Sequence, residues 1–96
     1  MTFGKLLKQI RTARKLTLAA LAEGLDLDAP RLSRYENGTG GTPSRVTIQR
    51  IVRGLDLSTV LSDKLHVLAG RIPSDVEDLL INQPQLIEMV REKGKQ

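Results

Sequence analysis

The chain has 96 residues and a net charge of +4, and only Phe3 and Tyr35 among its residues are Phe, Tyr or Trp. This length supports one folding unit with a modest core, which Leu, Ile, Val and Ala must build. The absence of cysteine excludes disulfides and zinc fingers, and the scarcity of aromatic rings disfavours single-strand or RNA binding by stacking.

Positive charge is concentrated in the first part of the sequence. Residues 1–57 hold ten Lys/Arg against five Asp/Glu, whereas residues 58–96 hold five against six. This asymmetry predicts that the first part meets phosphates. The first residues lack a secretion signal and no run approaches the roughly 20 apolar residues of a membrane span, so we expect a cytoplasmic protein without membrane contact.

The first predicted helix runs from about Phe3 to Lys15, with apolar residues at three- and four-residue spacing. Its inward residues are Phe3, Leu6, Leu7, Ile10 and Ala13. Thr17 is a natural N-cap for a short second helix. The apolar residues that share one face of this second helix are Leu18, Leu21, Ala22 and Leu25.

A third helix follows a bend at Asp26. Proline is tolerated in the first turn of a helix, so Pro30 fixes the start of this helix near Asp28 or Ala29. Gly38 ends it, because glycine adopts the left-handed conformation without a Cβ penalty. The inward residues of the third helix are Leu32 and Tyr35. Residues 16–38 therefore read as two short helices joined by a tight turn.

Two more helices follow a loop that contains three glycines. Ser44 caps a fourth helix that ends near Gly54, and Ser58 starts a fifth that ends at Gly70. Each runs through regularly spaced apolar residues, which predicts that both pack onto the first three helices.

The sequence predicts two further short helices beyond residue 70. Ser74 and Glu77 have the spacing of a capping box at the start of a sixth helix. Pro84 suits the first position of a seventh. The chain is thus predicted to form about seven helices.

The helix-turn-helix resembles that of the Xre/Cro family of phage-repressor-like regulators, over about residues 3–68. The family pattern is Thr or Ser, Gln, two variable residues, Leu-Ala, a turn, and then Leu-Ser-Arg-hydrophobic-Glu-x-Gly. The residues that fall in step are Thr17, Leu21, Ala22, Leu32, Ser33, Arg34, Tyr35, Glu36 and Gly38. The chain departs from it at Leu18, where Gln is frequent, and at Asp26, where a turn glycine is usual and where Asp tolerates positive φ.

This resemblance implies an all-α fold, a lambda-repressor-like helix-turn-helix bundle of about five helices with two additional short C-terminal helices. Residues 1–70 would be the DNA-binding domain and residues 71–96 a helical extension. The implied function is that of a sequence-specific, double-stranded-DNA-binding transcriptional regulator, a repressor that reads the major groove with the helix around residues 29–37.

The outward residues of that helix are the candidates for reading bases, namely Ala29, Pro30, Arg31, Ser33 and Arg34. Arg34 is the best candidate for a bidentate contact to guanine, whereas Arg31 reads a base or holds a phosphate. Ala29 and Pro30 offer only apolar contact, so we expect some reliance on DNA shape. The candidates for holding phosphates are Thr17, Asn37, Thr39, Arg45 and Arg50.

The resemblance also pairs Arg11 with Glu36 beneath the DNA-facing surface. This structural ion pair would orient a main-chain phosphate contact rather than read sequence, and removing one partner would leave a partly buried charge uncompensated. The alternative is two independent surface charges.

The last two helices hold more apolar residues than an exposed tail should. Because repressors of this kind bind paired half-sites, we expect a homodimer whose interface includes Leu79, Leu80, Leu86, Ile87 and Val90. The alternative is that these helices fold back over their own core. A different function also fits, that of an antitoxin or adaptor-type interaction module that binds a protein partner through residues 71–96.

The sequence does not predict an enzyme. His66 is the only histidine, and nothing suggests the convergent titratable groups that acid–base chemistry needs. We expect no catalytic residue, no metal site and no cofactor.

Overall fold

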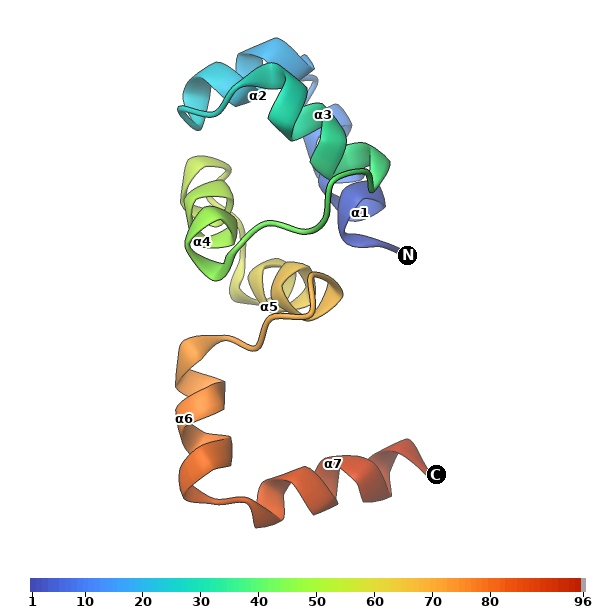
Figure 1. Cartoon of the computed structure of the whole chain (residues 1–96), viewed down its shortest axis with the longest axis vertical. Helices are drawn as coiled ribbons and strands as arrows, with labels where there is room; N and C mark the ends of the chain where they lie inside the picture. Colours follow the sequence, from blue (N-terminus) through green and yellow to red (C-terminus); the bar gives the residue numbers. More distant parts are fainter. Residues whose placement is uncertain (96) are drawn as a thin grey trace.

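A computed structural model describes residues 1–95. This range is all-helical, which confirms the predicted fold class. Its helices are α1 (Phe3–Ala13), α2 (Leu18–Gly24), α3 (Ala29–Asn37), α4 (Arg45–Gly54), α5 (Thr59–Leu68), α6 (Ser74–Asn82) and α7 (Gln85–Gly94). The first five gather into a bundle, and α6 and α7 extend from it as a bent arm (Figure 1).

The core lies inside the α1–α5 bundle and is aliphatic, as the composition predicts. Its fully buried leucines and isoleucines come from four helices and are Leu7, Leu32, Ile48, Ile51 and Leu65. At Gly4, a Cβ would lie 2.3 Å from the carbonyl oxygen of Glu36, so only glycine allows α1 to approach α3 this closely. Ala13 was predicted to face inward but is exposed, because α1 ends there and the chain turns away from the core.

The helix starts follow the predicted capping residues. The side chains of Thr17, Ser44 and Ser58 each accept a hydrogen bond from the amide three residues further on. Asp28 does the same for α3, where its Oδ1 is 2.7 Å from the amide nitrogen of Arg31. These bonds satisfy amides that have no partner inside the helix.

The five helices of the bundle are each followed by a left-handed residue, and only some of these residues were predicted. Asp26 has a φ of 55° and Gly38 a φ of 73°, as expected. Lys15 and Asp56 also have positive φ, at 58° and 49°. After each non-glycine residue of this kind a leucine amide bonds back to the helix, as Leu27 does to the carbonyl of Ala22 at 2.9 Å. This bond satisfies a terminal carbonyl and turns the leucine toward the core.

The α6–α7 arm is attached to the bundle by polar contacts. The predicted capping box is wrong, because Pro73 is the residue that precedes α6 and Ser74 already lies within it. Ser74 Oγ instead accepts a hydrogen bond from Arg45 Nη1 at 3.2 Å, and the Glu77 carboxylate pairs with the same guanidinium. Arg45, which is distant in sequence, thus binds both side chains that would have formed the capping box.

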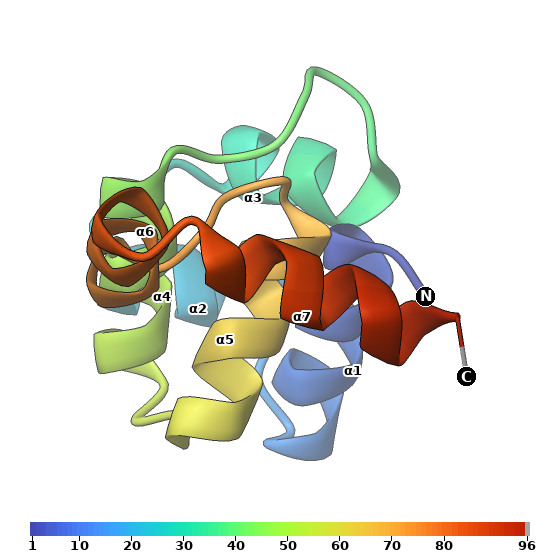
Figure 2. The same cartoon turned by 90° about the horizontal axis from the view of Figure 1, so that it is seen from below.

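The arm is exposed along its length. No described residue of α6 or α7 is buried. In the view from below, α7 lies in front of α5 and α1 (Figure 2), whereas Figure 1 shows that it stands apart from both helices. Over residues 1–95, no helix has the length and apolar character needed to cross a membrane. The division of the chain at residue 70 stays a prediction.

Candidate nucleic-acid interface

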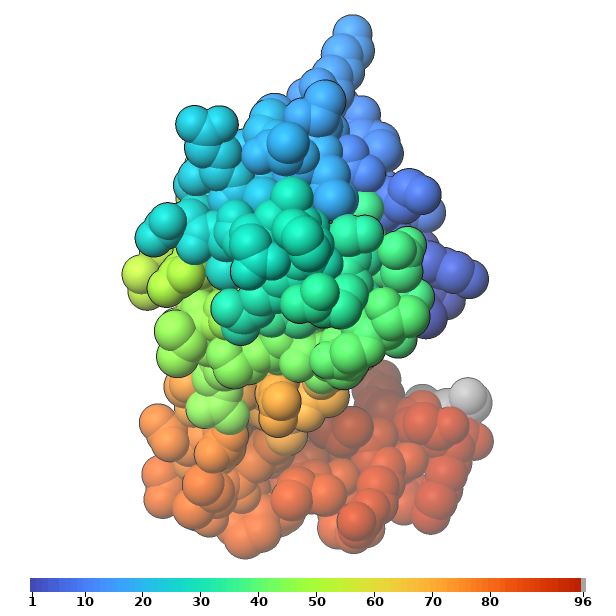
Figure 3. All heavy atoms as spheres, turned by 45° about the horizontal axis from the view of Figure 1, so that its top comes forward, coloured from blue at the N-terminus to red at the C-terminus, as the bar shows by residue number. Residues whose placement is uncertain are grey.

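The helix α3 presents one face to the core and one to solvent. Leu32, Tyr35 and Glu36 are buried, and α1 and α2 pack against that side. Pro30, Arg31, Arg34 and Asn37 are exposed on the other side. Figure 3 shows α2 and α3 next to each other on an uncovered surface, with the loop that follows α3 beside them. The predicted groove-reading helix is therefore open to a partner along its polar side.

Two residues of the predicted base-reading set lie partly away from this open face. Ala29 is half-buried and packs against the hydrophobic core. Ser33 is half-buried, and its hydroxyl accepts a hydrogen bond from Asn37 Nδ2 at 3.3 Å. The exposed members of the set are thus Pro30 and the two arginines.

The two arginines of α3 are held in different ways. Arg31 Nε donates to the Tyr35 hydroxyl at 2.8 Å, and the guanidinium carbon lies 5.7 Å from the centre of the Tyr35 ring. Arg34 lays its aliphatic stem beside the loop, where a Cβ at Gly40 would be 3.5 Å from its Cδ. Arg34 is exposed, and within residues 1–95 its guanidinium forms no hydrogen bond or ion pair, so its N–H donors are available to a partner.

The loop after α3 has a backbone that suits close approach to another molecule. Gly38, Gly40 and Gly41 all have positive φ, between 73° and 87°. Thr39 is exposed among them, and its amide is used within the turn, at 3.0 Å from the carbonyl oxygen of Arg34. The hydroxyl of Thr39 is therefore the group of this residue that could donate to a phosphate.

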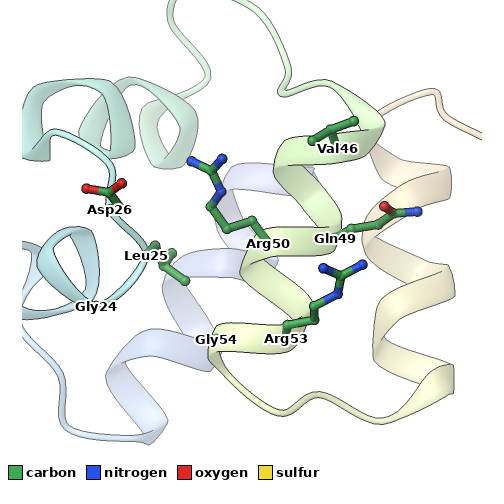
Figure 4. A pocket seen from close by; sticks show the side chains of 8 residues that line it. All are labelled: Gly24, Leu25, Asp26, Val46, Gln49, Arg50, Arg53 and Gly54. Atoms are coloured by element: carbon green, nitrogen blue, oxygen red, sulfur yellow. The ribbon is translucent and has the colours of Figure 1, made fainter.

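The other predicted phosphate contacts differ in their surroundings. Thr17 Oγ1 accepts from the amide of Ala20 at 3.1 Å, which leaves its hydroxyl proton to be donated outward. Arg50 is exposed and reaches into an open cleft of about 610 Å³ between α4 and the α2–α3 turn, whereas Arg53 turns toward Gln49 (Figure 4). Arg45 points to the arm, where Ser74 and Glu77 take its guanidinium.

On the inward side of α3, Glu36 forms a bidentate ion pair with Arg11 of α1. Arg11 Nε is 2.7 Å from Glu36 Oε2, and Nη2 is 3.0 Å from Oε1. The remaining Nη1 donates to the carbonyl of Leu16 at 2.8 Å. The two side chains are only 13% and 4% exposed. The hydrogen bonding of its guanidinium to the Glu36 carboxylate raises the pKa of Arg11 above its ordinary value.

This pair connects three segments that position the open face. It joins α1 to α3 and, through Leu16, to the chain just before α2. One guanidinium thus links α1, α3 and the chain before α2, in addition to the packing of α3 in the core.

Tyr35 is the residue of this region whose polar role the sequence analysis missed, since it was assigned only to the inward face. The signal that could have revealed it is the Arg-x-x-x-Tyr spacing, because residues four apart are neighbours on a helix surface.

The described residues offer no cluster for metal binding. In residues 1–95, no three side chains of His, Cys, Asp or Glu come together in a way that could hold an ion. His66 is buried, and its Nδ1 lies 2.8 Å from the carbonyl oxygen of Ser62. The histidine is thus part of the packing of α5.

Comparisons with known proteins agree with this geometry. Residues 2–65 match a family model described as a helix-turn-helix domain. The chain is 35% identical over 77 residues to the uncharacterized HTH-type transcriptional regulator RghRB of Bacillus subtilis (strain 168), a match that covers 80% of this chain and 53% of that protein. It is 38% identical over 56 residues to the HTH-type transcriptional repressor RghR of the same organism, covering 58% of this chain and 42% of that protein.

The chain therefore spans about half the length of the curated relatives it matches. No solved structure matches it significantly.

Proposed function

Because this chain belongs to the helix-turn-helix domain family, we propose that it is a sequence-specific DNA-binding transcriptional regulator that places α3 in the major groove. The observation that carries the proposal is the open face of α3, with two exposed arginines on a helix whose other side is fixed in the core. The names of both relatives, a transcriptional regulator and a transcriptional repressor, support it.

The proposed contacts follow from exposure and available donors. Arg34 reads guanine, and Pro30 offers an apolar contact such as one to a thymine methyl group. Thr17, Asn37, Thr39 and Arg50 hold phosphates. We leave Arg45 out of the phosphate-binding set because Glu77 and Ser74 occupy its guanidinium. We leave Ala29 out of the base-reading set because it packs on the core.

We propose repression as the regulatory effect and membership of the Xre/Cro family as the finer placement. RghR is named a repressor. The Xre/Cro placement is supported by the run from Leu32 to Gly38, in which the Glu of the pattern pairs with Arg11 and the Gly takes the left-handed conformation.

The proposal is tested by selecting duplexes from a random library with the purified protein. We expect enrichment of an inverted repeat with half-sites about 10 base pairs apart, as for other two-fold helix-turn-helix proteins. The logarithm of the affinity should fall with the logarithm of salt concentration with a slope of about −0.9 per neutralised phosphate. Recovery of duplexes without any sequence preference would contradict it.

We also propose that the α6–α7 arm joins two copies of the chain. Its two helices border an apolar groove of about 340 Å³, whose apolar residues are Val76, Leu79, Leu80, Leu86, Met89 and Val90. Of the predicted interface, only Ile87 lies outside the groove lining. Burial of an exposed apolar groove of this kind is energetically favourable. A second copy of the chain would also give the two-fold symmetry that paired half-sites require.

Placing a charge in the groove should prevent this association. In Val90→Glu, a carboxylate would have to be buried in a mostly apolar groove, so we expect the dissociation constant of the dimer to rise at least tenfold. Sedimentation equilibrium over a range of concentrations measures it. Val60→Glu is the matched control, since Val60 on α5 is 75% exposed and Val90 is 68% exposed. Equal behaviour of the two variants would contradict the proposed interface.

The same groove favours one second candidate, an antitoxin or adaptor-type module that binds another protein through residues 71–96. In that case the chain would copurify with its partner in fixed stoichiometry and would ignore duplex DNA. The salt-dependent selection above separates the two functions.

A further inference from the structure

Tyr35 lies next to Arg31 on α3 and contacts its guanidinium. Tyr35 is 8% exposed, so the core holds its ring in place. Its hydroxyl accepts from Arg31 Nε at 2.8 Å, and its ring lies 5.7 Å from the guanidinium carbon. The two contacts fix the plane of the guanidinium and use its Nε donor, which leaves the Nη1 and Nη2 edge for a ligand.

The position of Arg31 on the helix indicates which ligand that edge meets. At 3.6 residues per turn, Arg31 and Arg34 lie about 60° apart around the axis, and Tyr35 lies about 40° from Arg31 on its inward side. Arg31 therefore stands at the border of the open face, and its tie to Tyr35 draws the guanidinium toward that border. When a helix lies in a groove, the middle of its outer face meets base edges and its borders pass the phosphate backbones.

We propose that Tyr35 is a positioning residue that holds Arg31 as a phosphate clamp, which leaves base reading to Arg34. The inference rests on the proposed DNA-binding function. The Nη1 and Nη2 fork matches two oxygens of one phosphate. Because Tyr35 fixes the fork in advance, Arg31 loses less side-chain freedom when the complex forms.

The test compares Tyr35→Phe, Arg31→Ala and the double variant on two short duplexes, one with the selected site and one unrelated. Tyr35→Phe keeps the ring and removes only the acceptor. We expect it to weaken binding to both duplexes by the same factor, about three- to tenfold, the scale of the net contribution of one ordinary hydrogen bond. Arg31→Ala should also weaken both equally and make the salt slope shallower by about 0.9.

The double variant separates a positioning role from a structural one. If Tyr35 acts through Arg31, Tyr35→Phe has no further effect in the Arg31→Ala background. A loss that persists there, unchanged binding by Tyr35→Phe, or a preference altered at a single base pair would overturn the inference while the proposed function stands. Failure of the unaltered protein to bind any duplex would overturn both. Thermal unfolding of each variant checks that the fold is retained.

Discussion

Arg11→Met should lower the free energy of unfolding by about 3–5 kcal/mol, the usual cost of removing one partner of a buried ion pair. Methionine fills much of the same volume but leaves the Glu36 carboxylate without its two hydrogen bonds. It also leaves the carbonyl of Leu16 without its donor. For a chain of this size, each kcal/mol corresponds to about 4–8 °C in melting temperature, so thermal unfolding followed by circular dichroism measures the effect.

The chain contains its own control for this experiment. Arg91 pairs with Glu88 on α7, but both side chains are 65% exposed. Arg91→Met should therefore cost less than about 1 kcal/mol. Glu36→Gln in the Arg11→Met background removes the unpaired charge and should restore part of the loss. Equal melting temperatures for Arg11→Met and Arg91→Met would show that the pair adds nothing to stability.

The contribution of Arg11 to the stability of the fold should not change with pH near neutrality. The hydrogen bond to Glu36 raises the pKa of Arg11. A raised pKa stabilises the fold at every pH below the ordinary value for arginine and stops doing so only when strong alkali removes the proton. The difference in stability between the unaltered protein and Arg11→Met should thus be the same at pH 7 and pH 9.

Local sequence was sufficient to predict the helices of the bundle. Thr17, Asp28 and Ser44 act on amides only three residues away, so their effect is visible in the sequence itself. The left-handed turn at Asp26 was predicted from the motif. Lys15 also adopts a left-handed conformation, at the end of α1. No sequence signal predicts this turn, because lysine has no special preference for positive φ.

Contacts between segments distant in sequence were not predictable in the same way. Ser74 and Glu77 have the spacing of a capping box, but Arg45, some thirty residues earlier, competes for both side chains. The same contact removes Arg45 from the proposed phosphate set. The charge at residue 45 could be read from the sequence, whereas the direction of its side chain depends on where α6 leaves the bundle.

The candidate site was predictable where a motif fixes the order of residues. The positions of Arg34 and Glu36 within the pattern place one outward and one inward, as the structure has them. The difference between Arg31 and Arg34 could not be inferred from the motif, because it depends on the side-chain conformation that ties Arg31 to Tyr35. Two arginines three residues apart therefore have different proposed roles.

Arg34→Ala should abolish discrimination at one base pair of each half-site. A bidentate arginine–guanine contact is worth about 1–3 kcal/mol of discrimination, so the preference for the selected base pair should fall by roughly five- to 150-fold. The guanidinium of Arg34 is exposed near the centre of the open face, and the loop at Gly40 supports its stem. Competition binding with duplexes that differ at single positions measures the preference.

Arg34→Lys is the variant that distinguishes base reading from charge. Lysine keeps the positive charge but cannot present the planar fork, so it should retain most of the affinity for unrelated duplexes while losing the base preference. Neither Arg34 variant should change the salt slope by as much as Arg31→Ala does, because a base contact neutralises no phosphate. If Arg34→Ala instead weakens all duplexes equally and lowers the slope, Arg34 holds a phosphate. Discrimination would then have to come from the shape of the DNA and from apolar contacts such as the one proposed for Pro30.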